Sequence, residues 1–153
     1  MKHYYNYPSP VGNLLLGEEN GKLTLLAFNE DGLKKDSVPS PFLKDVAGQL
    51  DEYFAGKRRE FDVPLAAKGT DFQKDAWHEL LKIPYGETRS YKQIAERIGR
   101  PKAYRAVGLA NNRNPIAIII PCHRVVGSSG KLVGYGGGLS TKEFLLDLES
   151  KHS

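Results

Sequence analysis

The first third of the chain consists of short, β-favouring apolar runs separated by turn-forming residues. The runs 14–17 and 23–28 are rich in apolar side chains, and Asn20 and Gly21 lie between them. Asn and Gly both tolerate the positive φ of a type I′ turn, so this pair predicts a β-hairpin. Residues 61–65 carry apolar side chains at every second position and predict a further strand.

The rest of the chain shows helical spacing with recognisable helix boundaries. Residues 40–55 place apolar side chains on one face, and Gly56 follows as the expected stop. Capping boxes, in which a Ser or Thr is followed three residues later by Gln or Glu, predict helix starts at Thr70, Ser90 and Ser140. Pro101 suits the first turn of another helix, at about 101–112.

The pattern changes near residue 68, from a stretch that combines predicted strands with one helix to a stretch that is mostly helical. We therefore expect a small α/β domain over 1–68, with an antiparallel sheet and a helix, and a mostly helical domain over 69–153. Residues 90–112 have the size and the turn of a helix-turn-helix, so the second domain is expected to be winged-helix-like. Neither domain alone has enough residues for a large core, so the two are expected to pack as one α/β body.

The composition is that of a globular protein, with 40% hydrophobic and 26% charged residues. The apolar run 116–121 is far too short to cross a bilayer, and the first residues contain no apolar stretch of a secretory signal. Cys122 is the only cysteine, which excludes an internal disulfide and leaves too few ligands for a cysteine-based zinc site. We therefore expect a cytoplasmic protein that binds neither a membrane nor a metal.

Basic residues are concentrated in the second half. The chain has a net charge of +4, but residues 1–66 carry −2 and residues 67–153 carry +6. Between 89 and 131, nine Lys or Arg residues accompany a single acid, Glu96. Such a local excess is typical of a protein that binds a polyanion, although a solvated basic face would show the same count.

The second helix of the predicted helix-turn-helix differs from a usual recognition helix. Major-groove readers carry long polar side chains, whereas this helix carries small ones, namely Ala103, Ala106, Gly108 and Ala110. Small side chains allow a close approach to the minor groove, which suits binding that tolerates many sequences. Arg105 is the long side chain near the helix start. The alternative is that the small residues only pack against the preceding helix.

The segment from Pro121 to Arg124 contains a thiol and a titratable imidazole side by side in the sequence, because His123 directly follows Cys122. A solitary cysteine is more often structural than reactive, but the neighbouring basic segment and the glycine-rich stretch 134–138 favour a nucleophile. The thiolate is the reactive form, so a nearby base is needed. Adjacent side chains on an extended strand point apart, so His123 can serve only if the chain bends at Pro121 or a water bridges the two groups.

These motifs together resemble those of one family. They are Pro121-Cys-His-Arg124, Arg105-Ala-Val-Gly108, Asn114-Pro115, Gly134-Tyr135, Lys142 and Glu149. Over residues 70–149 the chain is similar to the methylated-DNA–protein-cysteine methyltransferases, also called 6-O-alkylguanine-DNA alkyltransferases. The N-terminal motif Ser9-Pro-Val-Gly-Asn-Leu-Leu-Leu16 is similar more loosely.

The resemblance implies a set of catalytic roles. Cys122 would accept the alkyl group from oxygen 6 of a damaged guanine, and by extension from oxygen 4 of an alkylated thymine, once per molecule. His123 would act as its base through a water, oriented by Glu149. Asn114 would hold the turn before the cysteine against the helix-turn-helix, and Tyr91 would donate a hydrogen bond to the leaving base. No cofactor is implied, because the protein supplies the nucleophile.

The resemblance also implies a DNA surface and a base pocket. Arg105 would enter the base stack where the damaged base is turned out of the duplex. The other implied DNA contacts are Lys102, Ala103, Tyr104, Ala106, Gly108 and Arg113. The implied pocket residues are Tyr135, Gly136, Gly137 and Val125. The expected partner is double-stranded DNA that contains an alkylated guanine, bound by a monomer.

Three alternatives stay open at this point. An alkyltransferase-like protein would bind the damage without transfer, but such proteins carry another residue in place of Cys122. A helix-turn-helix transcription factor would bind specific sequences, usually as a dimer. A cysteine hydrolase would turn over repeatedly, so stoichiometric kinetics would distinguish it.

Overall fold

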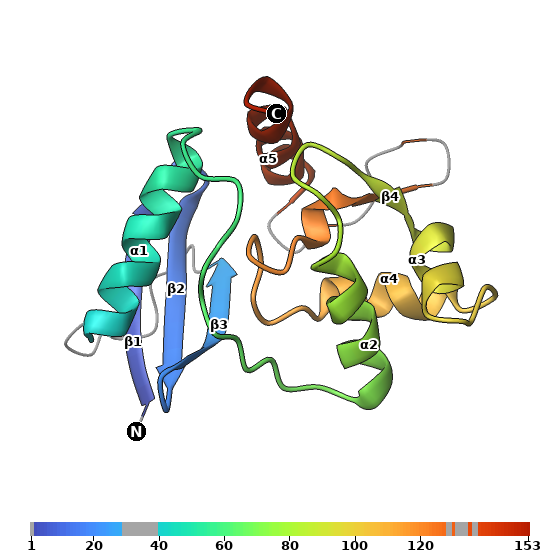
Figure 1. Cartoon of the computed structure of the whole chain (residues 1–153), viewed down its shortest axis with the longest axis horizontal. Helices are drawn as coiled ribbons and strands as arrows, with labels where there is room; N and C mark the ends of the chain where they lie inside the picture. Colours follow the sequence, from blue (N-terminus) through green and yellow to red (C-terminus); the bar gives the residue numbers. More distant parts are fainter. Residues whose placement is uncertain (1, 29–39, 128–129, 131–134, 136–137) are drawn as a thin grey trace.

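The computed structural model describes residues 2–28, 40–127, 130, 135 and 138–153. Figure 1 shows its two halves side by side. The N-terminal half is a three-stranded antiparallel sheet in the order β1-β2-β3, with one helix packed against it, as the hydrophobic pattern predicts. Its elements are β1 (Lys2–Ser9), β2 (Gly12–Glu19), β3 (Lys22–Phe28) and α1 (Pro41–Phe54).

A two-residue loop joins β2 and β3. Asn20 and Gly21 have φ angles of 54° and 74°, the positive values that a type I′ turn needs. Glu19 pairs with Lys22 across this turn. The predicted hairpin is therefore confirmed.

Helix α1 begins and ends where its sequence indicates. The Ser40 hydroxyl accepts a hydrogen bond from Leu43 N at 3.1 Å, and Pro41 occupies the first turn, where its missing N–H is not needed. Gly56 follows the helix with a φ of 76°. The apolar face of α1 ends in Tyr53, which is fully buried.

The C-terminal half is mostly helical, as predicted. Its elements are α2 (Asp71–Leu80), β4 (Arg89–Ser90), α3 (Tyr91–Arg97), α4 (Tyr104–Asn112), the 3-10 turn η1 (Cys122–Arg124), β5 (Val125–Val126) and α5 (Leu139–Lys151). Thr70 and Ser90 each form a complete capping box, which confirms the predicted starts of α2 and α3. α2, α3 and α4 pack against one another, and α3 and α4 form the expected helix-turn-helix (Figure 1).

Two predicted helix starts are wrong. The segment 101–103 forms a turn, so α4 begins at Tyr104 rather than three residues earlier. α5 begins at Leu139, because Gly138, with a φ of 95°, opens the helix and leaves Ser140 inside the first turn. Ser140 therefore does not cap α5, because Gly138 is the N-cap residue two positions earlier.

The predicted strand at 61–65 is also wrong. Only Leu65 forms a bridge there, with Leu23, and the rest of this described stretch is irregular. Leu23 N donates to Pro64 O at 2.8 Å, and Ala66 N donates to Leu23 O at 2.9 Å. Pro64 has no N–H to offer a ladder, which explains why alternating apolar residues do not become a full strand here.

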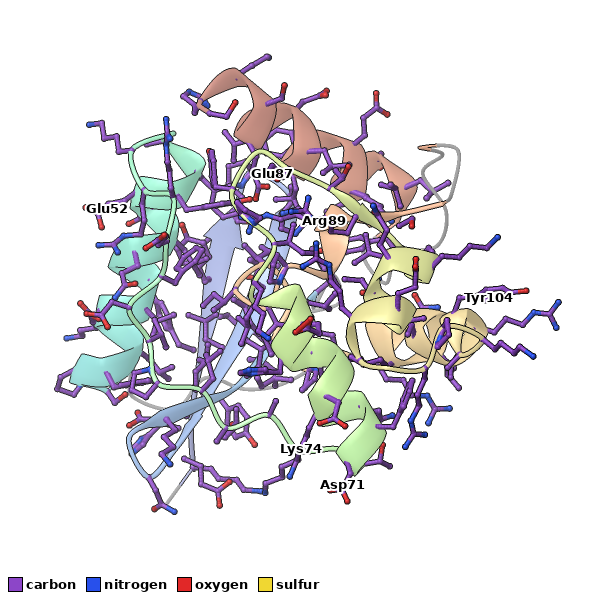
Figure 2. The ribbon with its side chains drawn as sticks, turned by 45° about the vertical axis from the view of Figure 1, so that its right-hand side comes forward. Glu52, Asp71, Lys74, Glu87, Arg89 and Tyr104 are labelled. Atoms are coloured by element: carbon purple, nitrogen blue, oxygen red, sulfur yellow. The ribbon has the colours of Figure 1, made fainter. Side chains whose placement is uncertain are left out.

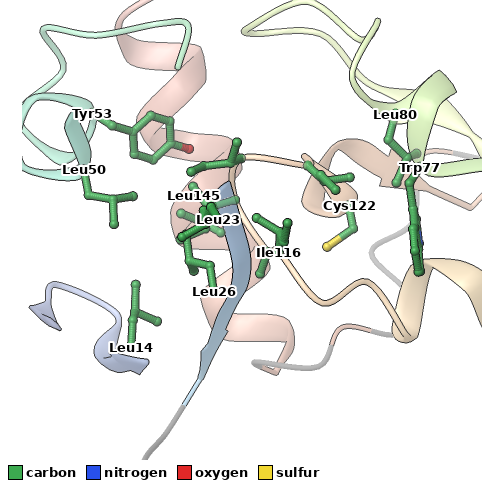
Figure 3. Close-up of a cluster of buried hydrophobic side chains, with 14 of the residues drawn as sticks. Leu14, Leu23, Leu26, Leu50, Tyr53, Trp77, Leu80, Ile116, Cys122 and Leu145 are labelled. Carbon is green, nitrogen blue, oxygen red and sulfur yellow. The ribbon is translucent and has the colours of Figure 1, made fainter. Parts of the chain in front are cut away.

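One hydrophobic core joins the two halves. Leu26 N donates to Pro115 O and Ala117 N donates to Leu26 O, both at 2.9 Å, so the outer edge of β3 is hydrogen-bonded to the segment that leads to Cys122. Figure 3 shows Leu26 on β3 and Ile116 between that strand and Cys122, and all three belong to one hydrophobic cluster. The N-terminal sheet therefore helps to position the candidate nucleophile.

Candidate active site and nucleic-acid interface

The chain turns sharply just before the cysteine. Cys122 N donates to Ile120 O at 2.7 Å around Pro121, whose φ of −80° and ψ of 66° define an inverse γ-turn. Residues 122–124 then form one turn of 3-10 helix instead of a strand. A bend at Pro121, one of the two conditions under which His123 could serve Cys122, is therefore present.

A second tight turn lies a few residues earlier. Ile119 N donates to Ala117 O at 2.8 Å around Ile118, which has a φ of 71°. A positive φ is strained for a β-branched residue, and such strain gathers at functional sites. Ile118 is 1% exposed, so the burial of its side chain offsets the cost of this backbone conformation.

Two asparagines near the end of α4 hold this segment in place. Asn114 Nδ2 donates to Ile120 O at 2.8 Å, and Asn114 Oδ1 accepts from Ile116 N at 2.9 Å. Asn111 Nδ2 donates to Cys122 O at 3.2 Å. These amides bond to backbone groups of Ile116, Ile120 and Cys122, and they connect the helix-turn-helix to the cysteine turn.

Cys122 lies in the wall of a pocket of about 230 Å³. Both halves of the protein line this pocket, with Phe28 from β3 and with Asn114 and Tyr135 from the C-terminal half. The rings of Phe28 and Tyr135 meet edge to face, with their centroids 5.7 Å apart. The pocket thus brings aromatic and amide groups to the thiol, a combination that suits a planar polar ligand.

A larger cavity of about 520 Å³ opens elsewhere, between residues 59–65 and 81–85. Arg124 forms part of its wall, but Cys122 does not. We therefore take the smaller pocket as the candidate active site, because Cys122, the candidate nucleophile, lines it.

A buried carboxylate next to the cysteine turn receives four hydrogen bonds. Among the described residues, Glu149 is bonded to His123 Nε2 at 2.7 Å, to Arg124 Nε at 2.7 Å and Nη2 at 3.0 Å, and to the Tyr53 hydroxyl at 2.6 Å. Burial raises the pKa of Glu149, but the hydrogen bonds and charges of His123 and Arg124 outweigh it and bring this pKa down to about 2. Glu149 is therefore ionised at neutral pH.

The ionised carboxylate fixes the tautomer of the imidazole. A carboxylate can only accept, so His123 Nε2 must carry the proton and Nδ1 must present a lone pair. Nδ1 is buried and has no hydrogen-bond partner within the described ranges. Burial lowers the pKa of His123, and the charges of Arg124 and Lys142 act in the same direction, whereas Glu149 raises it. The net lowering leaves His123 neutral and able to accept a proton.

The thiol itself is protonated at rest. Burial raises the pKa of Cys122, while the side chains of Asn114 and Tyr135 and the charge of Lys142 act in the opposite direction. Lys142 is fully buried, and its Nζ donates to Val125 O at 2.6 Å. A cation fixed at this depth favours the thiolate when the proton leaves.

Two phenols interact with the thiol. Tyr91, the first residue of α3, is partly buried, and burial together with Cys122 raises its pKa. Burial and Cys122 also raise the pKa of Tyr135 well above its ordinary value. The Tyr135 hydroxyl is buried, and its interaction is with the thiol of Cys122. Both phenols therefore keep their protons at neutral pH.

The expected DNA contacts lie on and just before α4. Those exposed to solvent are Lys102, Tyr104, Arg105, Ala106 and Arg113, while Ala103 and Gly108 are partly covered. Figure 2 shows Tyr104 at the outer edge of the molecule, among long side chains that point into solvent. Ala110, by contrast, is 2% exposed. The small residues of α4 therefore divide between packing against the protein and lining an open surface.

The predicted pocket residues differ in where the structure places them. Val125 is fully buried and is not among the described residues that line the pocket, and its backbone carbonyl accepts a hydrogen bond from Lys142 Nζ. Its contribution to the pocket stays a prediction. The predicted pocket residues Gly136 and Gly137 lie outside the described residues. Tyr135 does line the pocket.

Sequence reasoning left the role of Arg124 open between a phosphate contact and bonds to main-chain carbonyls, and it gave Lys142 and Tyr53 no role. Arg124 donates to Ile83 O at 2.8 Å besides its bonds to Glu149, and it therefore supports the site from within. Lys142 appeared only as part of a motif, without a role. Tyr53 gave no signal at all, because in the sequence it is one more apolar position on the face of α1.

No group of three or more potential metal ligands occurs among the residues that the structure describes. In the same part of the chain, no helix is long and apolar enough to span a membrane.

Comparison with known sequences decides the family. Residues 71–151 match the DNA-binding domain of 6-O-methylguanine DNA methyltransferase, and residues 2–67 match its ribonuclease-like domain. The chain belongs to this methyltransferase family. The resemblance inferred from the motifs is thereby confirmed, and with it an enzyme of DNA repair that binds DNA and transfers an alkyl group.

Individual relatives of the family agree over nearly the full length. The methylated-DNA–protein-cysteine methyltransferase of Methanosarcina barkeri is 55% identical over 156 residues, which cover 97% of this chain and 98% of the relative. That of Mycobacterium tuberculosis is 52% identical and covers 100% of this chain and 95% of the relative. The crystal structure of Mycobacterium tuberculosis OGT in complex with DNA is 53% identical, covers 99% of this chain and 94% of that one, and has a TM-score of 0.90.

Proposed function

We propose that this protein repairs DNA by moving the alkyl group of 6-O-alkylguanine, and of 4-O-alkylthymine, irreversibly onto Cys122. The observation that carries the proposal is the position of the only cysteine: it lines a pocket, and the residue after it is a buried imidazole bonded to an ionised carboxylate. The same geometry supports roles for His123 and Glu149 that the resemblance implies.

The proposed step is a single displacement. Cys122 Sγ attacks the alkyl carbon, the bond from that carbon to the base oxygen breaks, and its electron pair stays with the base. The thiol proton passes through a bridging water to His123 Nδ1, whose lone pair is available because Glu149 holds the proton on Nε2. Tyr91 donates a hydrogen bond to the base as negative charge develops, and the base then takes up one proton.

The substrate oxygen lies inside the base stack of a duplex, so the damaged nucleotide must leave the stack to reach a thiol that is 4% exposed. We assign Arg105 on α4 to the gap that the base leaves, because its side chain is long, charged and exposed near the start of this helix. The partly covered Gly108 and the exposed Ala106 would let α4 approach the minor groove. The proposed complex is a monomer on double-stranded DNA in the cytoplasm.

The product is a thioether, and the described site holds no group that would remove it. Each molecule is therefore expected to react once. This distinguishes the proposal from a hydrolase, which would release product and recover its thiol.

The test is mass spectrometry of the protein after incubation with a duplex that contains one 6-O-methylguanine. We expect one added methylene mass on the peptide that contains Cys122, reaching one adduct per protein and no more. A Cys122→Ala variant should gain no mass but still bind the duplex, because phosphate contacts supply most of the affinity. Binding of the wild type without any adduct would indicate a damage-binding protein instead.

A further inference from the structure

The N-terminal half contributes one side chain to the hydrogen-bonded network behind the nucleophile. Tyr53, the second-last residue of α1, is fully buried, and its hydroxyl donates to Glu149 Oε2 at 2.6 Å. Figure 3 shows the Tyr53 ring turned away from α1, with its hydroxyl toward the C-terminal half. The two residues are 96 positions apart in sequence, so this bond exists only in the assembled protein.

The bond falls on the oxygen that also holds the imidazole. Glu149 Oε2 is shared by His123 Nε2, Arg124 Nη2 and the Tyr53 hydroxyl, whereas Oε1 is bonded to Arg124 Nε. A hydrogen bond to a carboxylate oxygen withdraws electron density from it and makes it a weaker acceptor. The Tyr53 hydroxyl therefore weakens the pull of Glu149 on the imidazole proton without adding a charge.

Among the polar groups that surround this network in the described part of the chain, Tyr53 is the uncharged group that donates a hydrogen bond to Glu149. The groups that act on His123 or Glu149 are Arg124, Lys142, Tyr85 and Tyr135, together with the two residues themselves. Arg124 and Lys142 are held by hydrogen bonds to Glu149, Ile83 O and Val125 O, and neither receives a hydrogen bond from Tyr53 among the described contacts. The Tyr85 hydroxyl is buried close to the carboxylate but has no hydrogen-bond partner in the described part of the chain.

We propose that Tyr53 is a positioning residue of the reaction, which orients Glu149 and keeps His123 a neutral base, so that the N-terminal half completes the active site. This inference rests on the proposed function, because it assigns Tyr53 to the proton path of alkyl transfer. Tyr53 acts through Glu149 and touches neither substrate nor thiol.

The test is a Tyr53→Phe variant of the full chain, with His123 titrated by NMR through its ring nitrogens and carbon-bound protons. Loss of the hydroxyl makes Glu149 a stronger acceptor, so the pKa of His123 should rise by about 0.5 to 1. The acid limb of the pH–rate profile for alkyl transfer should move to higher pH by the same amount. The resonances of His123 are assigned by their absence from a His123→Gln variant.

Two matched variants separate this role from packing. Tyr85→Phe removes a hydroxyl near the same carboxylate that donates no bond to it, and it should leave the pKa of His123 unchanged. Phe61→Leu removes the ring whose centroid lies 5.4 Å from that of the Tyr53 ring, but it keeps the Tyr53 hydroxyl. This variant should have a lower melting temperature and an unchanged pKa of His123.

An unchanged pKa of His123 in Tyr53→Phe would overturn the inference, as would an equal shift in all three variants. If Tyr53→Phe does not fold, the Phe61→Leu variant decides. A shifted pKa of His123 in that variant overturns the inference, and an unchanged pKa supports it. The titration needs no substrate. A wild type that takes up no alkyl group would therefore refute the proposed function, while the His123 comparison would still decide whether Tyr53 controls the imidazole.

Discussion

The cysteine site and the surface of α4 are built in opposite ways. At the site, Cys122, His123, Arg124, Lys142 and Glu149 are all buried. On α4 and the turn before it, Lys102, Arg105, Ala106 and Arg113 are exposed. The residues of the candidate active site therefore belong to the core that stabilises the fold, whereas the proposed DNA-recognition surface lies outside the core. Substitutions in the first region should change stability and activity together, and substitutions in the second should change DNA binding with at most a small effect on stability.

The largest effect is expected for Glu149→Gln. The amide keeps the shape but removes the charge that pairs with Arg124 in the interior, and breaking one side of a buried ion pair costs about 3–5 kcal/mol. Urea denaturation should show this loss, while Arg105→Gln on the surface should stay within about 0.5 kcal/mol of wild type. A loss for Glu149→Gln as small as that of the surface variant would remove the contrast between the two regions.

The second-largest effect is expected from acid, which should lower the free energy of unfolding through the buried groups of the site. The pKa of Glu149 falls from an ordinary 4.5 to about 2 on folding, so its contribution is complete above the unfolded value and disappears as the pH falls toward the folded one. The pKa of His123 is lowered too, so protonation favours unfolding from about 6.5 downwards. The combined loss is on the order of 3 kcal/mol or more between neutral pH and pH 2.

This pH dependence is measured by denaturation at successive pH values. The Glu149→Gln variant is the control, since its curve should be flatter between pH 4.5 and 2, the range in which the carboxylate titrates. Parallel curves for the two proteins would show that other acids cause the loss.

Arg105→Ala should affect repair without affecting the fold. If Arg105 fills the gap left by the extruded base, its loss should slow transfer from duplex DNA roughly tenfold, a part of the unstacking cost of a few kcal/mol. Transfer from a free alkylated base should keep its rate, because no stacking is broken there. Equal slowing on both substrates would place Arg105 in the chemistry instead of the recognition.

The smallest effect is expected for Gly108→Ala. A Cβ at this position would meet the Tyr91 ring at 3.9 Å, an ordinary contact, and alanine favours a helix by up to about 1 kcal/mol over glycine. The variant should therefore be slightly more stable. It should nevertheless bind DNA more weakly if α4 approaches the groove at Gly108, and unchanged affinity in a binding titration would show that the approach lies elsewhere.

The regular elements were predictable because their signals are local. Asn20-Gly21, the capping boxes at Thr70 and Ser90, and the apolar face of α1 each lie within the element that they specify. Ser140 has the same signal, but Gly138 starts the helix first, which a single motif does not reveal. The division into two domains near residue 68 stays a prediction.

The site was predictable in its residues but not in its geometry. The motif identified Cys122, His123 and Glu149, whereas the two γ-turns around Ile118 and Pro121 follow from bonds to Asn114 and from the shared core. An apolar run of this kind would otherwise be taken for a strand. Tyr53 escaped prediction because its hydroxyl meets Glu149 only after both halves have folded together.

The hydrogen bonds between β3 and residues 115–117 have a consequence for how the molecule opens. β3 pairs with its own sheet on one edge and with the cysteine segment on the other, so it cannot separate from either without exposing the shared core. The protein should then unfold in one cooperative event, and the amides of Leu26 and Ala117 should exchange with solvent at the same rate. A bulky adduct on the sulfur would loosen the N-terminal sheet as well, and a spent molecule would become an easier target for proteolysis.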